Sequence, residues 1–169
     1  GVTISANTQA SGVTFDMGAS AFTVTTNANI TLTISGAGIT NNSGITQDFV
    51  SAVNGSGASG VIVFSNSATA GSMTAFTNAG SAFGSDSGGG TAFINTSSAS
   101  SATFIDSGGT VSLAEGGVTT FHNTATAGTG NFTNNGGAAS SASGGLSLFF
   151  DGASVGNAAF INNAGAGTC

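Results

Sequence analysis

The chain has 169 residues, with 29 glycines, no proline, no lysine and no arginine, and its six acidic side chains give a net charge of −6. Without a basic side chain it cannot neutralise phosphates, which excludes binding to nucleic acid or to an anionic membrane surface. The sequence contains no run of 18 apolar residues, so membrane insertion through a helix is excluded too.

Residues 1–60 are the less regular part of the chain. Apolar side chains alternate over residues 22–34, as in strands with one buried face, and the Asn-Ala-Asn sequence at 27–29 is typical of a turn. Phe22 and Phe49 extend a phenylalanine series of the second half backwards at intervals of 27. We therefore predict two looser coils here, because the terminal coils of repeat proteins are commonly atypical.

Residues 61–169 contain regular repeats, in which phenylalanine returns every 28 residues and is followed two places later by Asn or Asp. One series comprises Phe76, Phe104, Phe132 and Phe160 with Asn78, Asp106, Asn134 and Asn162. A second series, about 11 residues ahead, comprises Phe64, Phe93, Phe121 and Phe149 with Asn66, Asn95, Asn123 and Asp151. Self-similarity at such a period indicates a stacked-repeat architecture within one domain.

Each unit of 28 residues suffices for three short strands and three turns, with Gly-Gly pairs such as 88–89 and 116–117 at tight turns. The sequence therefore predicts an all-β fold, a parallel β-helix (β-solenoid) of roughly six coils. Equivalent residues then lie about 4.8 Å apart in neighbouring coils. Phe83 and Val111 predict a third, weaker internal stack that ends at Ala139.

The two phenylalanine series become internal stacks that exclude water from the core. The Asn and Asp residues two places later are expected to form ladders at the turns, because their short side chains bond to turn backbone and to one another. No helical period competes with this interpretation.

The repeats resemble those of bacterial autotransporter-type and other secreted surface proteins. The resemblance rests on ITLTISGAGITNNSG (30–44), on VIVFSNSATAG, and on the recurring Phe-x-Asn/Asp with Gly-Gly in ATFIDSGG (102–109) and NFTNNGG (131–137). It covers most of the chain. It implies a right-handed parallel β-helix that acts as a surface stalk or adhesin.

Stacking physics favours self-assembly, because a solenoid end has unpaired strand edges and neither terminus carries proline, lysine or a charge cluster to block them. We expect a secreted structural protein at the cell surface, with any signal peptide already removed, whose partners are copies of itself. Cys169, the sole cysteine, is the candidate for an intermolecular link, with a free thiol as the alternative. A fragment of a larger passenger is the alternative function.

Enzymatic function is not expected, and we predict no catalytic residue, no metal and no cofactor. The acidic residues are scattered along the repeats, and His122 occupies a variable place predicted to face solvent without neighbouring ligands. Calcium at Asp86 or Glu115 stays an alternative. Two parallel rows of Ser and Thr hydroxyls begin at Ser67 and Thr69. An ice surface or an extracellular carbohydrate is therefore a further alternative ligand.

Overall fold

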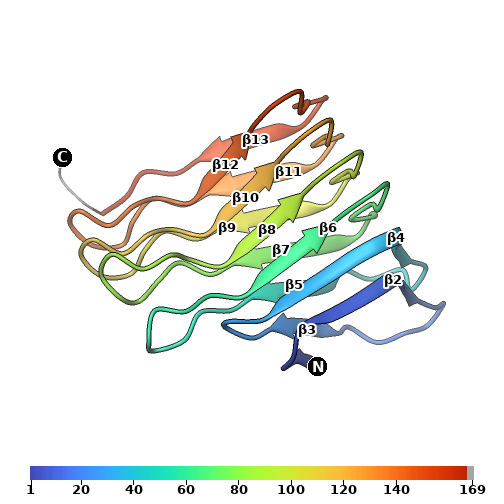
Figure 1. Cartoon of the computed structure of the whole chain (residues 1–169), viewed down its shortest axis with the longest axis horizontal. Coiled ribbons are helices and arrows are strands. Elements are labelled where there is room, and N and C mark those ends of the chain that lie inside the picture. Colours follow the sequence, from blue (N-terminus) through green and yellow to red (C-terminus); the bar gives the residue numbers. More distant parts are fainter. Residues whose placement is uncertain (167–169) are drawn as a thin grey trace.

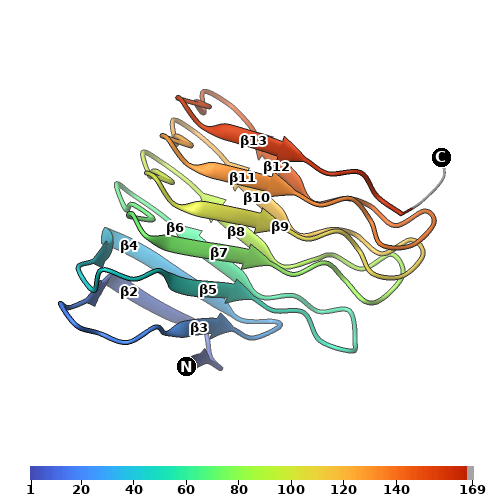
Figure 2. The same cartoon turned by 180° about the vertical axis from the view of Figure 1, so that it is seen from behind.

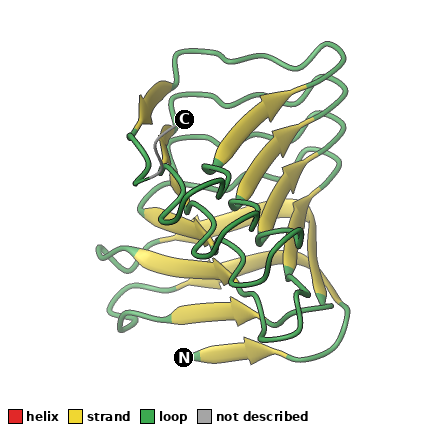
Figure 3. Cartoon of the chain, turned by 90° about the vertical axis from the view of Figure 1, so that its left-hand side faces the viewer, coloured by secondary structure: helices red, strands yellow, loops and turns green. Residues whose placement is uncertain are grey.

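A computed structural model describes residues 1–166, in which the chain winds into a parallel β-solenoid of about six coils (Figure 1). No helix occurs among the described residues, and hence none there that could cross a membrane (Figure 3). The predicted fold class and the repeat of about 28 residues per coil are confirmed.

Two parallel sheets form the walls of the solenoid. The seven-stranded sheet runs β1 (Val2–Ile4), β3 (Thr23–Thr26), β5 (Gln47–Ser51), β7 (Thr74–Asn78), β9 (Thr103–Asp106), β11 (Asn131–Asn134) and β13 (Ala159–Asn162). The six-stranded sheet runs β2 (Thr8–Phe15), β4 (Thr31–Asn41), β6 (Val61–Phe64), β8 (Gly90–Phe93), β10 (Val118–Phe121) and β12 (Leu146–Phe149). Figure 2 brings the seven-stranded sheet to the front.

The third side of each coil is not a full strand, in contrast to the expectation of three strands per coil. Thr69, Ser98, Thr126 and Ser154 make only single-residue parallel bridges to their neighbours. The reason is the short distance between turns, because residues with positive φ stand on both sides of each bridge, as Asn95 (φ 61°) and Ser100 (φ 55°) do around Ser98. Too few residues remain between those turns for a regular strand.

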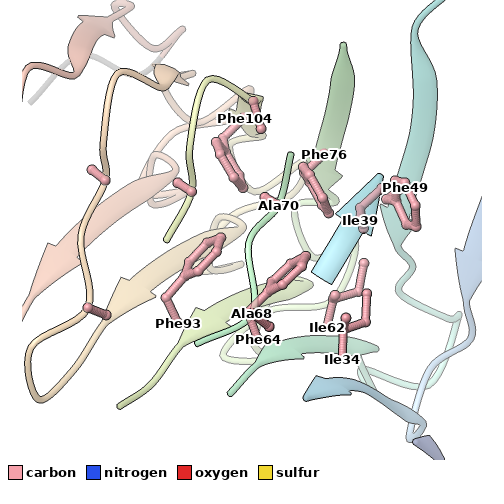
Figure 4. Close-up of a cluster of buried hydrophobic side chains, with 14 of the residues drawn as sticks. Ile34, Ile39, Phe49, Ile62, Phe64, Ala68, Ala70, Phe76, Phe93 and Phe104 are labelled. Carbon is pink, nitrogen blue, oxygen red and sulfur yellow. The ribbon is translucent and has the colours of Figure 1, made fainter. Parts of the chain in front are cut away.

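The core lies between the two sheets and consists mainly of phenylalanine (Figure 4). Rings of consecutive coils stack with centroids 4.7 to 4.8 Å apart from Phe64 to Phe149 and 4.7 to 5.0 Å apart from Phe49 to Phe160. Between the two stacks the rings meet edge to face, as Phe93 and Phe104 do at 5.7 Å and 77°. Both arrangements suit the aromatic quadrupole, so the dry centre is also well ordered.

The N-terminal coils are shorter than the others. Val24, not Phe22, pairs with Phe49 in the sheet, and Phe22 packs instead against Phe15 with ring centroids 6.0 Å apart. The prediction that Phe22 continues the stack is therefore wrong, because the first coils contain fewer residues than the later ones. Gln47, at the start of β5, is buried beside Phe22, and its Oε1 accepts a hydrogen bond from Phe22 N at 2.8 Å.

Loops 79–89, 107–117 and 135–145 protrude together from one corner, at the left of Figure 1, and we call them the protruding loops. Their Gly-Gly pairs do not form the tight turns that the sequence suggested; the positive φ angles belong to Ser85, Leu113 and Ser141. The glycines lie where the two arms of a loop join the sheets. There a Cβ on Gly117 would collide with the carbonyl oxygen of Asn78.

Phe83 and Val111 belong to these loops and are 43% and 39% exposed. The prediction that they form a third internal stack is wrong. The loop arms approach each other so closely at the glycines that no apolar interior extends into the loops.

Candidate functional site

Two columns of Asn and Asp, one per phenylalanine series, run along the solenoid axis, and they differ in kind. The turn column comprises Asn66, Asn95, Asn123 and Asp151, all of which are exposed. The interior column comprises Asn78, Asp106, Asn134 and Asn162, which end strands of the seven-stranded sheet.

In the turn column each residue adopts positive φ, between 56° and 61°, immediately after a strand of the six-stranded sheet. Asn tolerates this left-handed conformation better than most residues do. The backbone N–H of each member donates to the side-chain oxygen of the member in the next coil, as from Asn95 N to Asn123 Oδ1 at 2.9 Å. The same bond joins Asn66 to Asn95 at 3.0 Å and Asn123 to Asp151 at 2.9 Å.

The interior column points into the core, where Asn78 and Asp106 are 0% exposed. Asn78 Nδ2 donates to Asp106 Oδ1 at 2.7 Å, and Asn134 Nδ2 donates to Asn162 Oδ1 at 2.8 Å. The expectation that this series lies at a turn does not describe it, because these side chains sit at inward positions of β7, β9, β11 and β13.

Hydroxyl groups of the facing sheet complete the interior column, and the sequence analysis missed them. Thr91 Oγ1 donates to Asn78 Oδ1 at 2.8 Å, Thr119 Oγ1 to Asp106 Oδ1 at 2.9 Å, and Ser147 Oγ to Asn134 Oδ1 at 3.0 Å. Each hydroxyl lies 13 residues from its partner. The signal available was a Thr or Ser two places before Phe93, Phe121 and Phe149.

Asp106 is an ionisable group buried in this column, in a chain without lysine or arginine. Burial raises its pKa from 3.8 to about 6, against the opposite effect of hydrogen bonds with Asn78, Thr119 and Ser147. Its carboxyl group is thus held near neutrality at mildly acidic pH by desolvation, with no countercharge nearby.

The other acidic residues and the histidine do not form a metal-binding cluster in the part of the chain that the structure describes. Within residues 1–166, no three His, Cys, Asp or Glu side chains gather closely enough to hold a metal ion. His122 points outward from the six-stranded sheet and stacks on Phe150, with ring centroids 4.7 Å apart. Glu115 accepts a hydrogen bond from Ser87 Oγ at 2.9 Å. Cys169 lies outside the described residues.

The outward hydroxyls of the third side are largely engaged with backbone. Thr96 and Thr124 donate to the carbonyl oxygens of Asn66 and Asn95 at 2.9 and 3.2 Å. Ser98, Thr126 and Ser154 accept from backbone N–H groups two residues ahead, at 3.0 to 3.1 Å. These hydrogen bonds stabilise the turns on this side of the solenoid.

A shallow groove of about 270 Å³ runs where the protruding loops meet the outer face of the six-stranded sheet. Its floor is apolar, with Val118, Leu146 and Leu148, and its wall carries Glu115 and Ser143. A second hollow of about 240 Å³ shares Val118 with it and continues past Ala92. Gly90 and Ala92 deepen this part because their side chains are small or absent.

Among the described residues, nothing pairs with the outermost strands at either end of the solenoid. At one end β12 and β13 each lack a neighbour on one side, and at the other end β1 and β2 do. The core side chains there are only half-buried: Phe149 and Phe160 cover the last coil, whereas Phe121 and Phe132 beneath them are 0% and 1% exposed. The ends are therefore the largest interruption of both the hydrogen-bond ladders and the aromatic stacks.

Comparison with known proteins adds no relative: no protein-family model, no curated protein and no solved structure matches the chain.

Proposed function

We propose that the chain is a non-enzymatic, extracellular structural protein whose copies add end to end to form a surface fibre, filament or sheath. The observation that carries the proposal is the open edge of both sheets at both ends. Adjacent strands within each sheet are parallel. A second copy translated along the solenoid axis therefore presents its strands in the direction that parallel pairing requires. Unpaired edges of this kind are templates for another chain.

Apolar surface at the ends supports the same proposal. Phe149 and Phe160, which face the core on the last coil, are only half-buried, and Val2 on the first strand is 43% exposed. Burial of such side chains favours association by roughly 25 cal/mol for each Å² removed from water. A contact that joins different ends of the molecule is heterologous, and it propagates as a filament when it does not close into a ring.

Continuation of the sheet register defines the joint. The column that contains Phe132 and Phe160 runs back through Phe49 to Val24 and Val2, so Phe160 of one copy would cover Val2 of the next. In the same register Asn162 would meet Ile4. The first contact is apolar on apolar, whereas the second leaves the amide of Asn162 without a polar partner.

The test uses two lysine substitutions on β13, one at a position that faces the core and one at a position that faces outward. Asn162→Lys places an ammonium group at the inward position of the end face, where association would bury it against Ile4. Ile161→Lys places the same group on the outward face of the same strand and serves as the matched control. An unpaired buried charge is costly, so only the first variant is expected to remain unassembled.

Sedimentation velocity over a concentration series and electron microscopy of the same samples provide the readout. The parent chain and Ile161→Lys are expected to form threads that lengthen with concentration, and Asn162→Lys to stay monomeric. Particles of uniform, monomeric size from the parent chain at high concentration would overturn the proposal.

A second function has an observation of its own. The polar amide of Asn162 would find a better partner in a coil that carries Asn or Asp at the same position than in Ile4, as it does in Asn134 below it. We therefore propose as the alternative a passenger segment of a larger secreted surface protein, of the kind that the repeats resemble. Stable monomers that assemble only when further repeats are appended would favour it.

A further inference from the structure

The interior column has a consequence for proton binding that does not depend on assembly. Asn134 Nδ2 donates to Asn162, so its Oδ1 is turned towards Ser147 and accepts from the Ser147 hydroxyl at 3.0 Å. The same hydroxyl lies 3.4 Å from Asp106 Oδ2. A serine hydroxyl has one hydrogen to donate, so it cannot serve both oxygens at once.

The other oxygen of Asp106 has ample donors. Asn78 Nδ2 donates to Asp106 Oδ1 at 2.7 Å and Thr119 Oγ1 donates to it at 2.9 Å. With the Ser147 hydrogen committed to the nearer Asn134, no other side-chain donor lies within hydrogen-bond distance of the buried Asp106 Oδ2. A buried oxygen without a partner destabilises the folded state, and more strongly when it is charged.

We infer that Asp106 is a neutral carboxylic acid in the folded chain at mildly acidic pH, with its proton on Oδ2, donated to the hydroxyl oxygen of Ser147. The donations then all run in one direction along the column. Asn78 donates to Asp106, Asp106 to Ser147, Ser147 to Asn134, and Asn134 to Asn162. Every oxygen of the carboxyl group has a partner in this arrangement, and no charge is buried.

The surroundings of Asp106 offer no other ionisable group that could take this role. The strands packed around it, β7, β10, β11 and β12, contain no Asp, Glu or His, and the chain has no Lys or Arg. The elevated pKa of Asp106, about 6 through burial, agrees with the proton count. Between about pH 4 and pH 6 the folded chain therefore keeps the proton on Asp106, whereas the unfolded chain, with an Asp pKa near 3.8, has released it.

The direction of the pH effect follows from this raised pKa. Below about pH 3.8 the carboxyl group is neutral in both states and the folded state bears no penalty. As the pH rises towards about 6, the unfolded state ionises first, so the free energy of unfolding falls. Above about pH 6 both states are ionised and the loss is complete. The solenoid thus contains a proton-dependent element in its middle coils.

The experiment follows the Asp106 carboxyl carbon by NMR from pH 3 to pH 8 and the thermal midpoint over the same range. The expected midpoint of titration is near pH 6, and the expected thermal midpoint falls between pH 4 and pH 7. Asp106→Asn should abolish that fall, since Asn occupies the equivalent position in other coils. Asp151→Asn, in the exposed turn column, should leave the fall unchanged.

A third variant shows whether Asp106 or Ser147 donates the hydrogen bond between them. It keeps the inference testable even if Asp106→Asn does not fold. Ser147→Ala removes the acceptor of the proposed proton, so the midpoint of the Asp106 titration should shift downwards. An upward shift would mean that Ser147 donates to an ionised carboxylate, and it would overturn the inference. A parent titration near pH 4, or identical pH profiles for parent and Asp106→Asn, would do the same.

Discussion

The same three-residue motif, Phe-x-Asn/Asp, builds an exposed turn column on one side of the core and a buried interior column on the other. After Phe64 the strand β6 ends, so Asn66 enters a left-handed turn with φ 57°. After Phe76 the strand β7 continues for two more residues, and the alternation of a strand turns Asn78 inward beside Phe76. The place where the strand ends, rather than the motif, decides whether the amide faces water or the core.

The comparison predicts that the interior column is the more sensitive. Asn78→Ala leaves Thr91, Thr119 and Asp106 without the amide that now bonds to all three. Because these groups are buried, we expect a loss of about 3 kcal/mol in the free energy of unfolding. Urea denaturation measures it, and a loss below that of the turn-column variant would contradict the comparison.

Substitution of a glycine beside the interior column is expected to be more destabilising than substitution of a glycine beside the turn column. A Cβ on Gly145 would collide with the carbonyl oxygen of Asp106, whereas a Cβ on Gly152 would lie 3.3 Å from the carbonyl oxygen of Asn123. Gly145→Ala should therefore cost about 2–3 kcal/mol through a forced backbone shift, and Gly152→Ala should be nearly neutral. Thermal unfolding of the pair distinguishes them, and equal midpoints would count against close packing at the loop base.

In the turn column the backbone conformation matters more than the amide. Asn95→Ala should cost about 1–2 kcal/mol, because alanine pays the left-handed penalty and cannot accept the bond from Asn66 N. Asn95→Gly loses the same bond without the penalty and should cost less. If both variants are equally destabilised in urea, the side-chain bond dominates and this reasoning fails.

The smallest effect is expected at the last member of the turn column. Asp151 is exposed and its Oδ2 accepts from Asn123 N at 2.9 Å, a bond that Asn can also accept. Asp151→Asn should change the free energy of unfolding by less than about 0.5 kcal/mol. A larger change, measured by urea denaturation at neutral pH, would mean that the charge itself contributes to the turn.

The repeat period made the fold and both phenylalanine stacks predictable, because translation by one coil brings identical residues together. The division between the columns was not predictable, since Phe-x-Asn reads the same whether or not the strand continues past the phenylalanine. Gly-Gly pairs misled in a similar way: glycine is required for a positive φ and also for close backbone approach, and Gly117 meets the second need. Phe83 was assigned to the core because hydrophobicity alone does not reveal that a loop base is too narrow to hold side chains.

The groove along the protruding loops was also invisible in the sequence. It arises from two segments far apart within each coil, the outer face of β10 and β12 and the loop arms that carry Glu115 and Ser143. Gly116 and Gly144 at the loop base also line it.

Because each strand pairs only with the equivalent strands of the coils directly before and after it, the solenoid can be lengthened or shortened by whole coils. Residues 118–145 could be excised so that Leu146 follows Gly117, and β12 would then pair with β8 in the register that β10 now occupies. Length could thus be set in steps of one coil with the strand register kept, and insertion of a duplicate segment would extend the molecule by the same step.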